Sequence, residues 1–297
     1  MSFRSFLKIL LPDVLVQAYK RRRSKRRAAE REQLKQSGHV LRPQQMLQVL
    51  RQQGIQPGDA LMVHSSLSKL GYVEGGAEAV INVLLEGIGE QGTLLMPSFP
   101  GSGYNYDHLK NNPLFDVRHT PSNMGIITEV FRKHKGVLRS MHPTDPVCAF
   151  GKEAQWFVKD HFNQPTPYNE YSPFMKLVQR HGKILLLGVK LESVTNFHTP
   201  EDAINDFKFP VYHEKMFNAR LKDENGKELN MLTKVHNPEQ SKKRRCNDLE
   251  EAFLKDGVMK KFNMGAAVCY LIDAATMHHW LMEKYKEGVT MYTPEGS

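Results

Sequence analysis

The stretch GKILLLGVKLESVTNFHTPED, residues 182–202, decides how the fold of this chain is read. Its apolar run at 184–187 ends at Gly188, and a run of this length between a glycine and a polar loop predicts a strand buried on both faces. Residues that follow such a strand lie at the edge of a sheet, where α/β proteins place their chemistry. The loop after Gly188 carries the first candidate site residues, which are Thr195, His198 and Glu201.

The spacing of these three residues supports two interpretations. Histidine has an ordinary pKa of about 6.5, so His198 could accept a proton at neutral pH while Thr195 donates a hydroxyl and Glu201 orients the ring. That arrangement suits acyl transfer. The alternative is a capped helix start, with Thr195 or Thr199 as the cap and Glu201 in the first turn. Spacing alone leaves both interpretations open.

The rest of the body alternates predicted strands with predicted helices, without an internal repeat or a Pro/Ser linker. Residues 101–121, rich in Gly, Asn, Asp and Tyr, are predicted as part of a binding wall or lid. A turn at Asn225-Gly226, among alternating apolar residues at 208–217 and 219–233, predicts an antiparallel insertion. The predicted strands are 60–63, 93–96, 146–150 and 183–189, with extended chain at 137–142, and the predicted helices are 42–54, 77–88, 122–131, 153–162, 249–255 and 274–286.

The formal net charge of +9 belongs to the start of the chain. Residues 1–36 hold eleven Lys or Arg against three Asp or Glu, so eight of the nine net positive charges lie there and the body is almost neutral. The chain therefore divides into a basic amphipathic tail at 1–38, predicted to be helical, and a catalytic domain at 39–290. The 297 residues, of which 40% are hydrophobic, suffice for a full core in that domain.

The tail places apolar and aromatic residues at 3–19 directly before a basic run at 20–27. The apolar part is too short to span a bilayer, which takes about 20 residues, but it fits an anchor on an anionic membrane surface. A helix that packs on the body or on a partner is the alternative. No aromatic residues follow the basic run to stack on bases, so we expect no nucleic-acid partner. The order of charged and apolar parts is the reverse of a secretory signal.

The three cysteines are too scattered for a disulfide framework or a metal knuckle, and each is predicted to be a buried apolar residue. They are Cys148, Cys246 and Cys269. This usage indicates a reducing compartment, so we expect a cytoplasmic protein, with the tail on the inner face of the cytoplasmic membrane. His278 and His279 are adjacent on a predicted helix and point in different directions, so they make a poor metal pair. No metal site is predicted.

Between residues 61 and 202 the chain resembles the aminoglycoside 3-N-acetyltransferase family. The resemblance rests on seven segments in the same order over about 140 residues, which is too many for chance. The segments are LMVHSSLSKLGYVEGG (61–76), GTLLMPSF (92–99), TPSNMGIITEVFR (120–132), RSMHP (139–143), SPFMKL (172–177), KILLLG (183–188) and TNFHTPE (195–201). It implies an α/β fold with a central mixed sheet flanked by helices, together with the antiparallel insertion.

The resemblance also implies acetyl-CoA as the cosubstrate and direct attack by an amine, without an acyl-enzyme. His198 would be the general base, Glu201 would hold its ring and the Thr195 hydroxyl would stabilise the oxyanion. Small residues in the 64–76 loop let backbone N–H groups approach an anion at a helix start. The implied CoA-binding residues are His64, Ser65, Ser66, Ser68, Leu70, Gly71, Val73, Pro97 and Ser98. Carboxylates and polar groups that suit a cationic amine are Glu129, Asp116, His142 and Glu170.

The basic residues between 207 and 248 decide which amine we expect. Lysines and arginines there would repel a polycationic antibiotic but need not repel an amino sugar. We therefore expect N-acetylation of an amino sugar in polysaccharide assembly or sugar-nucleotide modification. The alternative is an aminoglycoside 3-N-acetyltransferase that confers antibiotic resistance, and an alternative of another class is a catalytically inactive, membrane-recruited binding protein. The sequence leaves a homodimer open.

Overall fold

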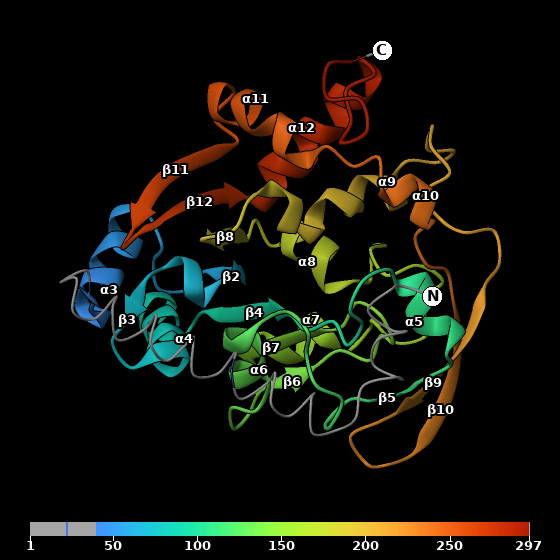
Figure 1. Ribbon diagram of the computed structural model, residues 1–297, viewed down its shortest axis with the longest axis horizontal. Coiled ribbons are helices and arrows are strands. Elements are labelled where there is room, and N and C mark those ends of the chain that lie inside the picture. The colour runs from blue at the N-terminus through green and yellow to red at the C-terminus, as the bar shows by residue number, and fades with distance from the viewer. Residues whose placement is uncertain (1–21, 23–39, 297) are drawn as a thin grey trace.

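The computed structural model describes residue 22 and residues 40–296, so the predicted tail at 1–38 lies almost entirely outside the described residues. A mixed sheet of seven strands forms the centre of the described part (Figure 1). In spatial order its strands are β11 (Met259–Met264), β12 (Ala267–Asp273), β8 (Lys183–Leu187), β2 (Ala60–Ser65), β4 (Thr93–Pro97), β7 (Val147–Gly151) and β6 (Leu138–Arg139).

The three central strands of this sheet run parallel. β2 pairs in parallel with β8 on one side and with β4 on the other, while the outer pairs are antiparallel. The carboxyl ends of β8, β2 and β4 therefore meet at one edge of the sheet, which is where open α/β sheets bind their ligands. The predicted buried strand after Gly182 is confirmed as β8.

Alternation along the central strands feeds a core on each face of the sheet, because successive strand side chains point to opposite faces. Met62, Leu95 and Ile184 join one core, whereas Leu61, Leu94 and Leu185 join the other. The first core is covered by α7 (Ala154–Val158), α8 (Pro173–Gln179), α11 (Glu250–Lys255) and α12 (Ala274–Lys286), and the second by α3 (Pro43–Gln52), α4 (Gly76–Ile88) and α6 (Ile126–Arg132). The expected α/β fold with flanking helices is confirmed.

A second, small sheet carries the predicted insertion and lies to one side of the main sheet (Figure 1). β9 (Phe217–Lys222) and β10 (Glu228–Thr233) form the antiparallel hairpin, and β5 (Leu114–Asp116) pairs with β9 in parallel. The prediction of strand from 208 was too long, because 208–216 is irregular apart from one bridge at Tyr212. Residues 101–121 are not loop throughout, since they contain α5 (Asn105–Lys110) and β5.

Other boundaries differ for local reasons. Helix α6 begins at Ile126, four residues later than predicted, because it follows Gly125, whose φ of 103° suits glycine. Strands β11 and β12 were not predicted. β11 lies at the sheet edge and exposes lysines that protect an edge from further pairing, which hides its strand pattern. All three cysteines are buried, as predicted. Within residues 40–296, we find no helix with the length and apolar character of a membrane span.

Candidate active site

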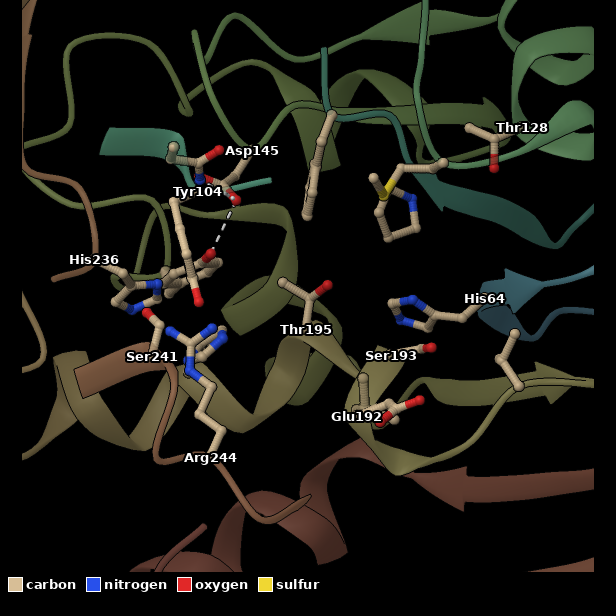
Figure 2. Close-up of a pocket in the computed structure, with 18 of the residues that line it drawn as sticks. His64, Tyr104, Thr128, Asp145, Glu192, Ser193, Thr195, His236, Ser241 and Arg244 are labelled. Carbon is tan, nitrogen blue, oxygen red and sulfur yellow. Dashed lines mark hydrogen bonds between the residues drawn. The ribbon is translucent and has the colours of Figure 1, made fainter. Parts of the chain in front are cut away.

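A cavity of about 330 Å³ opens at the carboxyl edge of the three parallel strands. Each strand contributes to its wall: His64 and Ser65 come from the end of β2, Pro97 ends β4, and the segment after β8 supplies Glu192 to Thr195. The remaining wall includes Tyr104, Asp145, His236, Ser241 and Arg244 (Figure 2). The sheet topology thus explains why residues far apart in the sequence meet here.

Gly188 directs the chain from β8 into this cavity. Its φ is 68°, and a Cβ at this position would lie 2.7 Å from the Cβ of Lys69, so only glycine fits without strain. The chain then makes two short 3-10 turns, Leu191–Ser193 and Thr195–His198, before α9 (Thr199–Ala203). These turns place Thr195 and His198 on the cavity wall.

The helix-cap interpretation of Thr195 and Thr199 does not describe this loop. No side chain caps either the Thr195–His198 turn or α9. The Thr199 hydroxyl instead donates to the carbonyl of Asn196 at 2.9 Å. Thr195 lies near the middle of the cavity in Figure 2, between His64 on one side and His236 with Arg244 on the other.

Glu201 joins His198 to a larger buried network. Its Oε2 lies 2.8 Å from Nδ1 of His198 and 3.0 Å from Nε2 of His236. Its Oε1 accepts a hydrogen bond of 2.6 Å from the Tyr292 hydroxyl. The carboxylate is therefore held from three directions, and with Nδ1 of His198 bonded to it, Nε2 is left as the ring atom for proton transfer.

The protonation states follow from burial and pairing. Burial lowers the pKa of His198 to about 3, although the Glu201 carboxylate acts to raise it. Burial would raise the pKa of Glu201, but His198 and the hydrogen bonds from both histidines outweigh it and hold that pKa well below its ordinary value. At neutral pH the site therefore contains a neutral His198 beside an ionised Glu201. The expected histidine pKa near neutrality is corrected downward, because the ring is desolvated.

His198, Glu201 and His236 also form the one cluster of metal-binding side chains within residues 40–296. Their ligand atoms all lie within 4.8 Å of one another. Each of these atoms already takes part in the hydrogen-bonded network, so hydrogen bonding accounts for the cluster without an ion. The prediction of no metal site stays a prediction.

A second hollow, of about 600 Å³, adjoins the cavity and shares Val189, Glu192 and Ser193 with it. Ser66 lies in this hollow, as do three lysines: Lys69, Lys190 and Lys261. The other predicted CoA residues are distributed around the two spaces. His64, Ser65 and Pro97 line the cavity, whereas Ser68 is exposed and Ser98 is buried behind the wall. Leu70 and Val73 lie in the core, so only their backbone can reach a ligand, and Gly71 lies between them in the chain.

None of the four predicted amine-binding residues lines the cavity. Glu129 is paired with Arg132 at 2.8 Å, and that hydrogen bond is the main reason why its pKa is lowered. Asp116 accepts hydrogen bonds from the 118–119 backbone in the small sheet. His142 is fully buried and stacks on His161 at 4.7 Å, and Glu170 is exposed.

The cavity instead contains polar residues that sequence reasoning did not single out. Asp145 is 2% exposed, accepts hydrogen bonds from Asn105 and the Tyr168 hydroxyl, and has a pKa raised by burial. His236 and Arg244 follow the insertion. Arg244 is one of the basic residues between 207 and 248 on which the expectation of an amino sugar rests, and the tertiary structure shows that it is the one among them that lines the cavity.

Comparison with known proteins finds acetyltransferases of one family, both by sequence and by fold. Residues 62–286 match the family model described as aminoglycoside 3-N-acetyltransferase. A SPbeta prophage-derived aminoglycoside N(3')-acetyltransferase-like protein, YokD of Bacillus subtilis, is 35% identical over 53% of this chain and 64% of its own length. The chain thus spans just under two thirds of that relative. Aminoglycoside N(3)-acetyltransferase III of a Salmonella species is 32% identical over 76% of this chain and 85% of the relative.

A solved structure described as AAC-IIIb binary with CoASH has the same fold. It aligns with a TM-score of 0.72 at 24% identity and covers 86% of this chain and 100% of the solved chain. The similarity in fold therefore extends over most of the chain.

Proposed function

This chain belongs to the aminoglycoside 3-N-acetyltransferase family, and from that premise we propose that it is an acetyl-CoA-dependent N-acetyltransferase with His198 as its general base and an amino-sugar amine as its acceptor. The observation that carries the proposal is the pair of His198 and Glu201, 2.8 Å apart, on a cavity wall that also holds Thr195. An amine attacks a thioester only when it is neutral, so the reaction needs a nearby group that accepts its proton.

The proposed reaction needs no covalent enzyme intermediate. The amine nitrogen attacks the acetyl carbonyl carbon, and the negative charge that develops on the carbonyl oxygen is stabilised by the Thr195 hydroxyl. Nε2 of His198 takes a proton from the attacking nitrogen. When the C–S bond breaks, the imidazolium returns that proton to the CoA sulfur, so His198 ends neutral and Glu201 stays ionised throughout.

The positions of the cavity and the adjoining hollow indicate from which side each substrate would approach Thr195. The hollow contains Lys69 and Lys190, together with Lys261, which is paired with Glu250 at 2.8 Å. The first two lysines, which form no salt bridge with another described residue, suit the phosphates of CoA, and the hollow meets the cavity at Glu192 and Ser193. His64, Glu192 and Ser193 lie on one side of Thr195 in Figure 2, whereas Asp145, His236, Ser241 and Arg244 lie on the other. The thioester would reach Thr195 from the first side, and the acceptor amine would occupy the second.

Two observations favour different acceptors. The relatives are named as N(3)-acetyltransferases of aminoglycosides, which supports the antibiotic reading more than the polysaccharide or sugar-nucleotide reading. The cavity favours the second candidate, an amino sugar of another kind, since its wall contains the cation Arg244 and only two carboxylates, Asp145 and Glu192. Like charge disfavours an acceptor with several ammonium groups.

The proposal is tested by following CoA release from acetyl-CoA with kanamycin, gentamicin, glucosamine and a nucleotide-linked amino sugar. We expect acetylation of at least one amine by the wild type and loss of about 10³-fold or more in kcat for His198→Ala, since general-base catalysis contributes roughly 10²–10⁴. His279→Ala changes an exposed histidine on α12 and is the matched control. Turnover by His198→Ala within tenfold of the wild type would overturn the assignment of the base.

A further inference from the structure

Arg244 is a partly buried cation that forms no salt bridge with another described residue, and it lies at the acceptor end of the cavity. It follows α10 (Pro238–Ser241), and its guanidinium shares the cavity wall with Ser241 and His236 (Figure 2). Its Nε and Nη2 are buried and have no carboxylate or carbonyl partner within residues 40–296, and the Tyr292 hydroxyl is the neighbour that interacts with the guanidinium. Leaving the N–H groups of a buried charged residue unpaired is costly, so such a group indicates a missing ligand.

The carboxylates near Arg244 are committed to other groups. Both oxygens of Glu201 are taken by His198, His236 and Tyr292. Asp145 accepts its hydrogen bonds from Asn105 and Tyr168. Burial lowers the pKa of Arg244, but Tyr292 and Glu201 outweigh it, so the guanidinium stays charged and is influenced by Glu201 without pairing with it. Neighbouring arginines differ: Arg245 pairs with Asp248 and Glu295.

We propose that the acceptor carries an anionic oxygen group, a phosphate or a carboxylate, in the same molecule as the amine, and that Arg244 binds it. This inference rests on the proposed N-acetyltransferase function. A guanidinium presents parallel pairs of N–H donors, which is the geometry that two oxygens of a phosphate or carboxylate accept, and Arg244 lines the cavity. The Ser241 hydroxyl on the same wall can add a third donor.

The location of Arg244 assigns this anion to the acceptor and not to CoA. The lysine-containing hollow, which suits the CoA phosphates, joins the cavity on the side of Glu192 and Ser193. Arg244 lies across Thr195 from that junction (Figure 2) and does not line the hollow. The substrate class is therefore an amino sugar that bears phosphate, a nucleoside diphosphate or a carboxylate.

The alternative role for Arg244 is to balance the charge of Glu201, which would make it a positioning residue for catalysis. The two roles give different kinetic patterns. A residue that acts only through Glu201 affects every acceptor by the same factor. An anion-binding residue changes the ratio between anionic and neutral acceptors, because only the anionic ones form the hydrogen bonds that the substitution removes.

The experiment measures kcat/KM for glucosamine, glucosamine 1-phosphate, glucosamine 6-phosphate, an aminouronic acid, a UDP-linked amino sugar and kanamycin. We expect the wild type to prefer at least one anionic acceptor over glucosamine by about 10-fold to 100-fold, as charged hydrogen bonds allow. Arg244→Gln should bring that ratio close to one, and Arg244→Lys should restore it in part. Arg245→Gln, in which a neighbouring exposed ion pair is removed, should keep the wild-type ratio. Preference for a phosphate or for a carboxylate identifies the source of the charge.

Two outcomes overturn the inference while leaving the proposed function intact: wild-type preference for glucosamine or kanamycin over every anionic acceptor, or an equal loss for all acceptors in Arg244→Gln. Calorimetric titration of the same sugar phosphates into the wild type and Arg244→Gln gives a readout that does not need turnover. Binding that depends on Arg244, without acetylation of any amine, would support the inference and overturn the proposed acceptor chemistry. Equal binding to both proteins would contradict the inference.

Discussion

Glu201→Gln removes the negative charge at the centre of the site and keeps the shape of the side chain. The carboxylate accepts hydrogen bonds from His198, His236 and Tyr292 at 2.8, 3.0 and 2.6 Å. An amide has one accepting oxygen and one donating nitrogen, so it cannot serve all three donors. The substitution therefore leaves at least one of these buried groups unpaired.

The expected magnitude follows from the His198 contact. In the proposed reaction His198 becomes an imidazolium 2.8 Å from Glu201, and a hydrogen bond to a charged group contributes about 1.5–3 kcal/mol. Loss of that term lowers kcat by about 10-fold to 150-fold. If the amide nitrogen faces Nδ1, the ring also adopts the wrong tautomer, and the loss can approach the roughly 10⁴-fold known for the equivalent change in a serine protease triad. We therefore expect a loss in kcat between about 10-fold and 10⁴-fold.

Thiol release from acetyl-CoA measures this change in kcat, and calorimetry measures CoA binding in parallel. CoA affinity should stay within about threefold of the wild type, because Glu201 is absent from the walls of both the cavity and the lysine-containing hollow. Glu239→Gln is the control, since it neutralises an exposed carboxylate paired with Lys242. If Glu201→Gln folds, binds CoA and retains more than a third of wild-type kcat, the reasoning that gives Glu201 its role is refuted.

Two further predictions follow from the same geometry. Thr195→Ala should lower kcat by about 10²–10³-fold, the loss known for one oxyanion donor, whereas Thr195→Ser should keep most of the activity; equal rates for both variants in the thiol assay would remove Thr195 from that role. Burial lowers the pKa of His64 to about 4 and the pKa values of His161 and His198 to about 3. Below about pH 6.5 the unfolded chain therefore binds more protons than the folded chain. The free energy of unfolding should fall as the pH drops from about 6.5 towards 3, by up to about 1.4 kcal/mol per pH unit for each histidine. Asp145 and Asp202, whose pKa values are raised by burial, act in the opposite sense, and an unchanged melting temperature between pH 7 and 5 would contradict the prediction.

The sequence predicted the part of the site that is local in the chain. Strand β8 is predictable from four consecutive apolar residues, because it is buried on both faces. Thr195, His198 and Glu201 follow it within a short segment of the chain. Strands β2 and β4 are predictable for the same reason. Once these strands are parallel neighbours, their carboxyl ends must share an edge, so His64, Ser65 and Pro97 meet at one cavity.

The parts that the sequence did not predict depend on long-range pairing. His236 and Tyr292 lie 35 and 91 residues from Glu201 and carry no local signal that marks them as its partners. The opposite error arises at Glu129, a carboxylate in a matching segment that looks suitable for an amine. Arg132, three residues away, forms an ion pair with this carboxylate, and only the side-chain geometry shows that its charge is already balanced.

The two ends of the cavity are built from different parts of the chain. For this reason, membership in the family indicates the reaction type more firmly than it indicates which acceptor is used. The thioester end is made by strand ends of the central sheet, where a change in backbone would disturb the core. At the acceptor end, His236, Ser241 and Arg244 belong to the segment after the β9–β10 hairpin, outside the main sheet. Connecting segments accept substitutions more readily than the sheet they flank. The charge of the side chains at the acceptor end can therefore change while His198 and Glu201 keep their geometry. In this chain Arg244 makes that end of the cavity suited to an anionic group.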